Sequence, residues 1–220
     1  VPVLAGSATN NLGITELLDA IVDLLPSPAA MPAVKATGVD GKTSAELTAD
    51  ADGPMAALVF KTTADPFVGS LSYFRVFSGT LKSDSQVWNS TKSQAERIGQ
   101  VLVLRGKSQE QTDGLVAGDI GAVAKLAATA TGDTLTQRDP ALVLESIHFP
   151  DPIYILAINP KSKADLDKMS NSLARLTEED PTLHVRREVA TSEILLEAMG
   201  DTHVDVAVEK AKRKFGVELL

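Results

Sequence analysis

The chain has 220 residues, of which 44% are hydrophobic, 23% charged and 4% aromatic, and its formal net charge is −8. This length fits one large domain or two small ones, and the acidic balance excludes a surface that is basic throughout and binds nucleic acid anywhere. The absence of cysteine excludes disulfides, thiolate zinc sites and cysteine nucleophiles. No apolar run approaches the ~18 residues that a membrane span needs, so we expect no membrane partner.

The first segment predicts a helix followed by a linker. The start, Val1-Pro2, has neither Met nor a basic region, so we expect no signal peptide and a cut from a longer chain. Apolar residues then recur at helical spacing: Ile14, Leu17, Leu18, Ile21, Val22 and Leu25. Pro26 and Pro28 end this helix, because proline lacks the amide donor. Residues 26–54 show no sustained period and are expected to form a linker, with a short strand at most.

The middle of the chain predicts a small antiparallel barrel. Short apolar runs are separated by turn residues such as Ser78-Gly79 and Gly118-Asp119. The runs cover residues 57–61, 71–77, 86–89, 98–104, 115–116, 120–126 and 141–147. Many short strands with regular turn signals are typical of a β-barrel. Because aromatic residues are rare, its core is expected to consist of Val, Leu, Ile and Ala.

The last third predicts an α+β domain in the order βαββα. A strand over 153–158 precedes Ser162, a helix N-cap with Asp165 three residues later. The helix that follows, strands over 183–187 and 193–196, and a helix over 201–215 complete the order. A ferredoxin-like domain needs one more strand, which is either truncated or formed by residues 216–220.

Several segments, in order from residue 1 to 220, resemble elongation factor G. They are Gly6-Ser7-Ala8, Asp65-Pro66-Phe67-Val68-Gly69, Arg75-Val76-Phe77-Ser78-Gly79, Glu96-Arg97-Ile98-Gly99, Ala117-Gly118-Asp119-Ile120, Thr131-Gly132-Asp133-Thr134-Leu135, Phe149-Pro150-Asp151-Pro152, Glu178-Glu179-Asp180-Pro181, Met199-Gly200-Asp201-Thr202-His203 and Lys212-Arg213-Lys214-Phe215. The resemblance implies a remnant of a GTPase domain over residues 1–25, a linker over 26–49, a β-barrel domain II over 50–148, and a ferredoxin-like domain III over 149–220.

The resemblance also implies a function. The longer protein would be a cytoplasmic GTPase that uses GTP and magnesium and couples hydrolysis to ribosomal translocation. This piece would be non-catalytic and monomeric, without a cofactor of its own. Its partners would be ribosomal RNA and the longer protein's own GTPase and C-terminal domains.

Two short motifs concern nucleotide binding. Gly41-Lys42-Thr43 supplies the second half of a P-loop, but the first glycine would fall on Ala36, so we interpret the match as accidental. By the resemblance, Ser7 and Ala8 correspond to a loop whose backbone N–H groups contact the guanine base. Without the phosphate-binding loops, we expect these two residues alone to bind no nucleotide.

The histidines and acidic residues offer no local catalytic or metal motif. His148, His184 and His203 are too far apart in sequence for such a metal motif, so a structural or surface role is expected. The resemblance adds that Gly200 and His203 lie on a face of domain III toward the GTPase domain, near the fusidic acid pocket. The acidic cluster over 178–181 is expected to be a solvated turn after a helix.

Basic residues supply the candidate RNA contacts. Lys210, Lys212, Arg213 and Lys214 crowd the end of the last helix, where cations interact favourably with the helix dipole. Lys210, Arg213 and Lys214 are predicted to share a face, and the resemblance offers them as ribosomal RNA contacts. On the barrel, the corresponding candidates for phosphate contact are Arg75, Lys82, Lys92, Arg97, Arg105 and Lys107.

Two alternatives stay open, and departures from the family pattern bear on the first. The chain has Ser192-Glu193-Ile194 where the family has Gly-Gln-Thr, and Asp201-Thr202 where it has Glu-Leu. These changes suggest a divergent or second-copy factor, such as a ribosome-protection or release and recycling GTPase. The other alternative is a free-standing binding module unrelated to translation.

Overall fold

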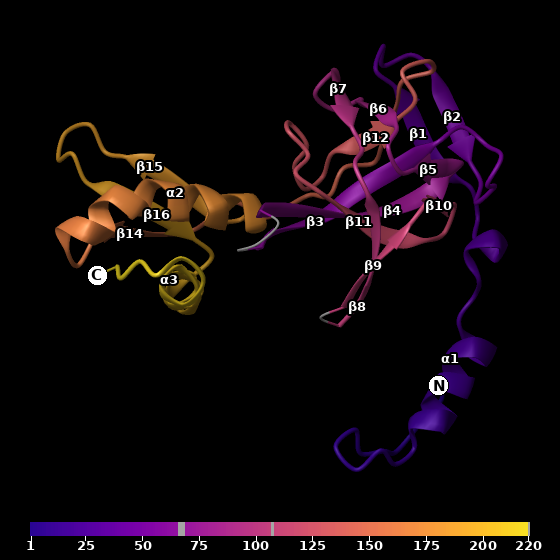
Figure 1. Cartoon of the computed structure of the whole chain (residues 1–220), viewed down its shortest axis with the longest axis horizontal. Helices are drawn as coiled ribbons and strands as arrows, with labels where there is room; N and C mark the ends of the chain where they lie inside the picture. Colours follow the sequence, from indigo (N-terminus) through magenta and orange to yellow (C-terminus); the bar gives the residue numbers. More distant parts are fainter. Residues whose placement is uncertain (66–68, 107, 220) are drawn as a thin grey trace.

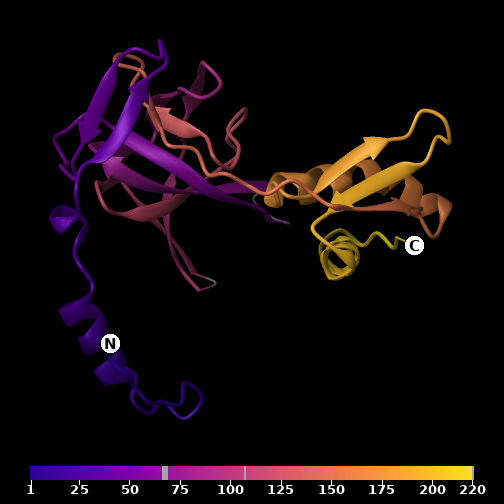
Figure 2. The same ribbon diagram turned by 180° about the vertical axis from the view of Figure 1, so that it is seen from behind.

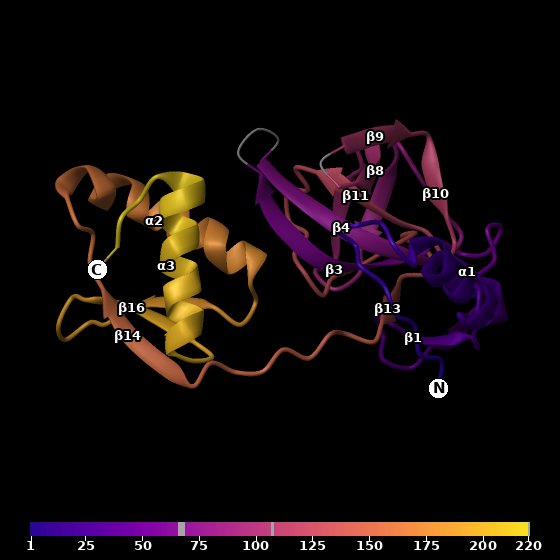
Figure 3. The same cartoon turned by 90° about the horizontal axis from the view of Figure 1, so that it is seen from below.

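The computed structural model describes residues 1–65, 69–106 and 108–219. An N-terminal arm leads into a β-rich lobe, and an α+β lobe follows (Figure 1). Residues 145–153 join the two lobes without forming a helix or strand (Figure 3). In the described part of the chain, no helix is both long and apolar enough to cross a membrane.

The arm contains α1 (Ile14–Leu24) and a short 3-10 turn, η1 (Pro28–Ala30), so the predicted helix is confirmed. None of the residues of α1 is buried, and its apolar face is open, with Val22 79% exposed. The helix lies away from both lobes (Figure 1). Because this apolar face is exposed to solvent, hydrophobic burial contributes little to the stability of α1 in this arrangement.

The β-rich lobe is built around one antiparallel sheet in the order β7-β6-β12-β3-β4-β11-β8-β9. Its strands are β3 (Ala56–Asp65), β4 (Gly69–Ser78), β6 (Gln86–Asn89), β7 (Gln94–Arg97), β8 (Val101–Arg105), β9 (Ser108–Thr112), β11 (Ile120–Ala124) and β12 (Thr134–Thr136). A second pair is formed by β5 (Thr80–Lys82) and β10 (Gly114–Val116). The main core contains one aromatic residue, Phe74, among Val, Leu and Ile side chains, as the composition predicts. The antiparallel barrel is therefore confirmed.

The predicted linker over residues 26–49 needs correction, because it contains two strands. β1 (Val34–Gly38) and β2 (Ser44–Leu47) pair with each other, and β1 also pairs with β13 (Leu142–Leu144). These strands bury Ala36 and Leu47 in a core of their own at the side of the barrel. Both strands are short and contain Lys, Thr, Ser and Glu, which is why no sustained apolar period marks them in the sequence.

Gly41-Lys42-Thr43 forms the turn between β1 and β2, which excludes a strand-to-helix phosphate loop at this place. The Asp40 carboxylate accepts hydrogen bonds from the N–H groups of Lys42 and Thr43, each at 3.0 Å. These bonds, led by that from Thr43, hold the pKa of Asp40 below its usual value. The loop amides that would cradle a phosphate are therefore already used by a side chain of the same turn.

The second lobe has the predicted order: β14 (Tyr154–Ile158), α2 (Lys163–Glu179), β15 (His184–Arg187), β16 (Ile194–Ala198) and α3 (Asp201–Phe215). Ser162 caps α2 by accepting the Asp165 N–H at 3.2 Å, as expected. The sheet is antiparallel in the order β14-β16-β15, and both helices pack on one face of it around a single core (Figure 3). Leu219 forms an isolated antiparallel bridge with Pro160, just past the end of β14.

Candidate functional site

The end of α2 meets both the barrel and the first turn of α3, and this meeting point is the candidate site. From behind, the last turn of α2 lies against the end of β3 (Figure 2). Two consecutive acidic residues, Glu179 and Asp180, make the contacts. They belong to the cluster that the sequence predicts as a solvated turn. That interpretation holds for the exposed Glu178 but is wrong for Glu179, whose side chain is only 6% exposed.

Glu179 connects the two lobes. Its Oε1 accepts the backbone N–H of Ala64, on β3, at 2.7 Å. The same oxygen forms an ion pair with the ammonium group of Lys214, which also approaches the Ala64 carbonyl oxygen at 3.5 Å. One carboxylate therefore joins β3, α2 and α3. A charged acceptor in so enclosed a place makes stronger hydrogen bonds than a neutral one.

Asp180 connects the end of α2 to the start of α3. Its Oδ1 accepts the N–H of Thr182 at 3.0 Å and the Thr182 hydroxyl at 2.6 Å, and its Oδ2 lies 3.0 Å from His203 Nε2. Burial raises the pKa of Asp180, but the hydrogen bonds from Thr182 and His203 outweigh that effect and leave its pKa below the usual value.

The hydrogen bonds of His203 define its tautomer. The Met199 N–H donates to His203 Nδ1 at 3.1 Å, so the neutral ring carries its proton on Nε2 and donates that proton to Asp180. Both ring nitrogens are thus occupied within the lobe. His203 holds the beginning of α3 in place, while the preceding Gly200 and the exposed Asp201 and Thr202 form the outer surface of this turn.

The three basic residues predicted to share a face of α3 do not act together. Lys214 turns to Glu179, at the contact between the lobes. Lys210 and Arg213 line a shallow depression on the outer side of the helix, together with Thr202, Val206 and the two acidic residues Asp205 and Glu209. The three residues keep their helical spacing on α3, but the Lys214 side chain turns away from the other two because it pairs with the Glu179 carboxylate.

The basic residues of the barrel are also in different environments. Lys92 pairs with the buried Asp133 at 3.1 Å, and Arg75 stacks on Phe77, with 5.4 Å from guanidinium carbon to ring centroid. Arg105 lies 3.8 Å from Glu110. Lys82 and Arg97 are exposed. The sixth candidate, Lys107, and residues 66–68 of the family-like motif lie outside the described residues.

Ser7 and Ala8 lie in a tight loop of the N-terminal arm. Ser7 and Leu12 exchange two backbone hydrogen bonds of 3.0 Å, and the Ser7 hydroxyl lies 3.2 Å from Thr9 Oγ1. The loop leads directly into α1, far from the site at the end of α2 (Figure 1). The structure thus keeps these two residues apart from Gly200 and His203.

Sequence reasoning missed two buried carboxylates of the barrel. Glu96, only 3% exposed, accepts the N–H groups of Ala127 at 3.1 Å and Ala128 at 2.5 Å, and so holds the loop before β12. Asp133 accepts from Asn89 and from the Ala130 N–H at 2.9 and 2.8 Å. Both residues belong to segments that resemble elongation factor G, which was the only available signal for them.

Comparisons with known proteins agree with this architecture. Residues 54–138 match the family model described as elongation factor G domain 2, and residues 149–220 match elongation factor G, domain III. A crystal structure of a protein from Thermus thermophilus is similar, with a TM-score of 0.73 and 28% sequence identity over 96% of this chain. The matched region spans 29% of the length of that protein. With two consecutive domain matches and this structural likeness, the chain belongs to the elongation factor G-like family and carries its domains II and III.

Proposed function

We propose that this chain is the part of an elongation factor G-like translational GTPase that transmits movement between domains and contacts the ribosome. The observation that carries the proposal is the joint between the lobes. A single buried carboxylate, Glu179, connects the domain II barrel to both helices of domain III. GTP hydrolysis with magnesium in a GTPase domain would change how these domains pack, and the factor would couple that change to translocation.

The N-terminal arm supports a GTPase domain as neighbour. The open apolar face of α1 fits a helix that packs against the remainder of such a domain, with Ser7 and Ala8 in its guanine-binding loop. We therefore propose the division into residues 1–25 as the GTPase remnant, 50–148 as domain II and 149–220 as domain III. The two strands within residues 26–49 belong with the barrel.

Ribosomal RNA is the proposed partner of the exposed basic residues. Lys210 and Arg213 on α3, and Lys82 and Arg97 on the barrel, remain available for phosphate groups, whereas Lys214 and Lys92 are held in ion pairs. Such contacts are salt-sensitive and independent of base sequence. A cytoplasmic location follows from this role.

A specialised relative, of the ribosome-protection or release and recycling type, is the second candidate. The observation that favours it is the departure from the family pattern at Asp201-Thr202. There the Asp201 carboxylate accepts the Thr202 N–H at 2.6 Å at the exposed start of α3. The family also has an acidic residue at the position of Asp201, so the departure is Thr202, an exposed polar residue in place of Leu, which changes the surface that the resemblance assigns to the GTPase domain.

Co-sedimentation with ribosomes tests the proposal. We expect the purified chain to bind weakly, to lose binding as salt rises, and to show neither GTPase activity nor binding of a fluorescent GDP analogue. Binding that is unchanged across a wide salt range, or micromolar affinity for the GDP analogue, would contradict it. A P-loop in the flanking DNA upstream would remove the free-standing module, and an assay of the longer protein on stalled or drug-bound ribosomes separates the translocase from the specialised relative.

A further inference from the structure

The outer edge of β15 is open in the described part of the chain. β15 pairs only with β16, and the sheet ends there. Beyond the strand, the Glu188 N–H bonds to the Glu193 carbonyl at 2.9 Å. Because bonded pairs alternate along an antiparallel ladder, His184 and Arg186 bond to β16, and Val185 and Arg187 direct their N–H and C=O groups outward. The edge therefore offers two donors and two acceptors in strand geometry.

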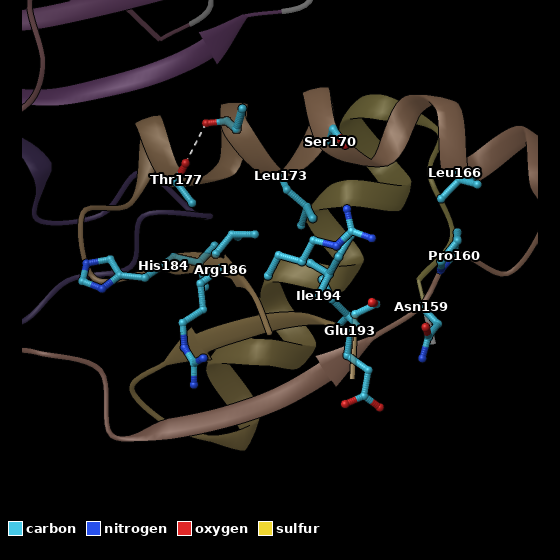
Figure 4. A pocket seen from close by; sticks show the side chains of 16 residues that line it. Asn159, Pro160, Leu166, Ser170, Leu173, Thr177, His184, Arg186, Glu193 and Ile194 are labelled. Carbon is cyan, nitrogen blue, oxygen red and sulfur yellow. Dashed lines mark hydrogen bonds between the residues drawn. The ribbon is translucent and has the colours of Figure 1, made fainter. Parts of the chain in front are cut away.

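A groove runs beside this edge, between β15 and α2. Its volume is about 910 Å³. Thr177 and His184 lie at one end, and Leu166 and Pro160 lie at the other (Figure 4). The apolar part of its wall comes from Ile158, Leu166, Leu173, Ala174, Leu183, Val185 and Ile194. An apolar groove parallel to an open strand edge is suited to side chains of an added strand.

The charged side chains along β15 favour an acidic partner strand over a second copy of the same strand. Of its two arginines, Arg186 pairs with Glu197 at 2.5 Å and Glu188 at 2.8 Å. Arg187, which lines the groove, forms no ion pair with any described residue, whereas Glu193, the acidic residue that also lines the groove, accepts a hydrogen bond from the Thr191 hydroxyl at 2.7 Å. Edge-to-edge pairing of two copies would bring basic side chains together, which is unfavourable. A carboxylate opposite Arg187 would be favourable.

The chain's own tail does not fill this position. Glu218 accepts the Lys161 N–H at 3.0 Å, and Leu219 bridges Pro160, both at the β14 side of the sheet. The β15 side is left to a partner from another chain or from a distant segment.

We propose that β15 and the groove beside it bind an extended acidic peptide segment in trans. The segment adds as a fourth strand to the outer side of β15, places alternate apolar side chains in the groove, and sets a carboxylate against Arg187. Main-chain hydrogen bonds supply affinity, and the groove and the arginine supply specificity. This site is separate from the Glu179 joint and from the basic surface of the proposed ribosome contact.

Fluorescence polarisation of labelled six-residue peptides against the whole chain tests the proposal. A capped peptide that alternates Glu and Leu is expected to bind with micromolar affinity, and one that alternates Lys and Leu at least about tenfold more weakly. Hydrogen exchange followed by NMR adds a residue-specific readout. The Val185 and Arg187 amides should gain protection on binding, while those of His184 and Arg186, already bonded to β16, should not change.

Variants separate the parts of the site. Arg187→Glu should weaken the acidic peptide about tenfold and strengthen the basic one, a reversal that a merely misfolded variant would not give. Ser170→Trp, on the α2 side of the groove, should block both peptides. Arg213→Glu makes the same charge change on α3 and should leave binding unaffected.

Four results would overturn the proposal. The first is no polarisation change up to about 1 mM chain. The second is binding that survives Arg187→Glu and Ser170→Trp unchanged. The third is protection at a segment other than β15. The fourth is a uridine oligonucleotide that displaces the peptide from β15 and binds there more tightly, which would assign the edge to RNA. None of these results bears on the ribosome binding tested above.

Discussion

Replacing Glu179 with alanine should loosen the contact between the two lobes. Its carboxylate accepts the Ala64 N–H at 2.7 Å and pairs with Lys214, and the two charged side chains are 6% and 27% exposed. Without the carboxylate, the Ala64 N–H loses its acceptor, and the Lys214 ammonium keeps only the Ala64 carbonyl oxygen at 3.5 Å. Neither group regains full hydration while the lobes stay docked.

The change in the docking free energy of the two lobes follows from the lost hydrogen bond of the Ala64 N–H and the lost ion pair of Lys214. A buried donor without an acceptor costs about 1–3 kcal/mol, and breaking a fully buried ion pair costs about 3–5 kcal/mol. Lys214 retains access to water, so the second loss is smaller than for a fully buried pair. We expect about 2–3 kcal/mol in favour of separated lobes, which is roughly a 30- to 150-fold shift in the docking equilibrium.

Single-molecule fluorescence energy transfer can measure this shift, because the chain has no native cysteine. Dyes at Gln94→Cys on the barrel and Asp205→Cys on α3 report the separation of the lobes, since both positions are exposed. Glu179→Ala should broaden the distance distribution, and the exposed neighbour Glu178→Ala should not. An unchanged distribution in Glu179→Ala, or equal broadening in both variants, would refute the reasoning.

Further substitutions test the barrel and the end of α2. Gly79→Ala should lower the free energy of unfolding, measured by thermal unfolding, by more than about 2 kcal/mol, because φ is +73° and the added Cβ would lie 2.5 Å from a backbone carbon. Gly41→Ala is the control: φ is +67°, but the added Cβ would meet no atom within 4 Å, so the loss should be only about 1 kcal/mol. Glu96→Ala should destabilise the barrel by about 3 kcal/mol by releasing two amides, which Glu110→Ala would not do. Asp180→Ala should cost about 1–2 kcal/mol at neutral pH in urea titrations. The pKa of Asp180 is lower in the folded state than in the unfolded state. The stabilisation by this carboxylate is therefore complete above the ordinary aspartate pKa of about 3.9, and it disappears as the pH falls through the folded-state pKa.

The elements with clear local signals could be predicted from the sequence. α1 and α3 begin and end within one residue of the expected positions, and β6 matches the expected run. Each has its own local signals, such as Pro26 after α1 and the apolar stripe of α3. The strands that no expected apolar run covered are three to five residues long: β1, β2, β5, β7, β9 and β12. β9 and β7 are almost wholly polar, so only pairing with distant segments defines them.

The candidate site was harder to predict than the fold. His203 could be selected because a family-like segment surrounds it, but its partner Asp180 lies 23 residues earlier. Glu179 could not be selected, since its acceptor role depends on a backbone amide 115 residues away on β3. An acidic run before proline has the composition of a solvated turn, and no local pattern distinguishes a carboxylate that meets another lobe.

The two contacts at the end of α2 depend on one another through the backbone. Glu179 is the last helical residue and Asp180 the C-cap, whose N–H still bonds to the Leu176 carbonyl at 3.0 Å. Pro181 then prevents the helix from continuing, because proline disfavours helical geometry in the residue before it. The same helix end thus directs one carboxylate to β3 and the next to His203. A displacement of the first turn of α3 acts on Asp180 directly and reaches Glu179 across a single peptide unit. The joint with the barrel and the start of α3 are therefore parts of one mechanical connection.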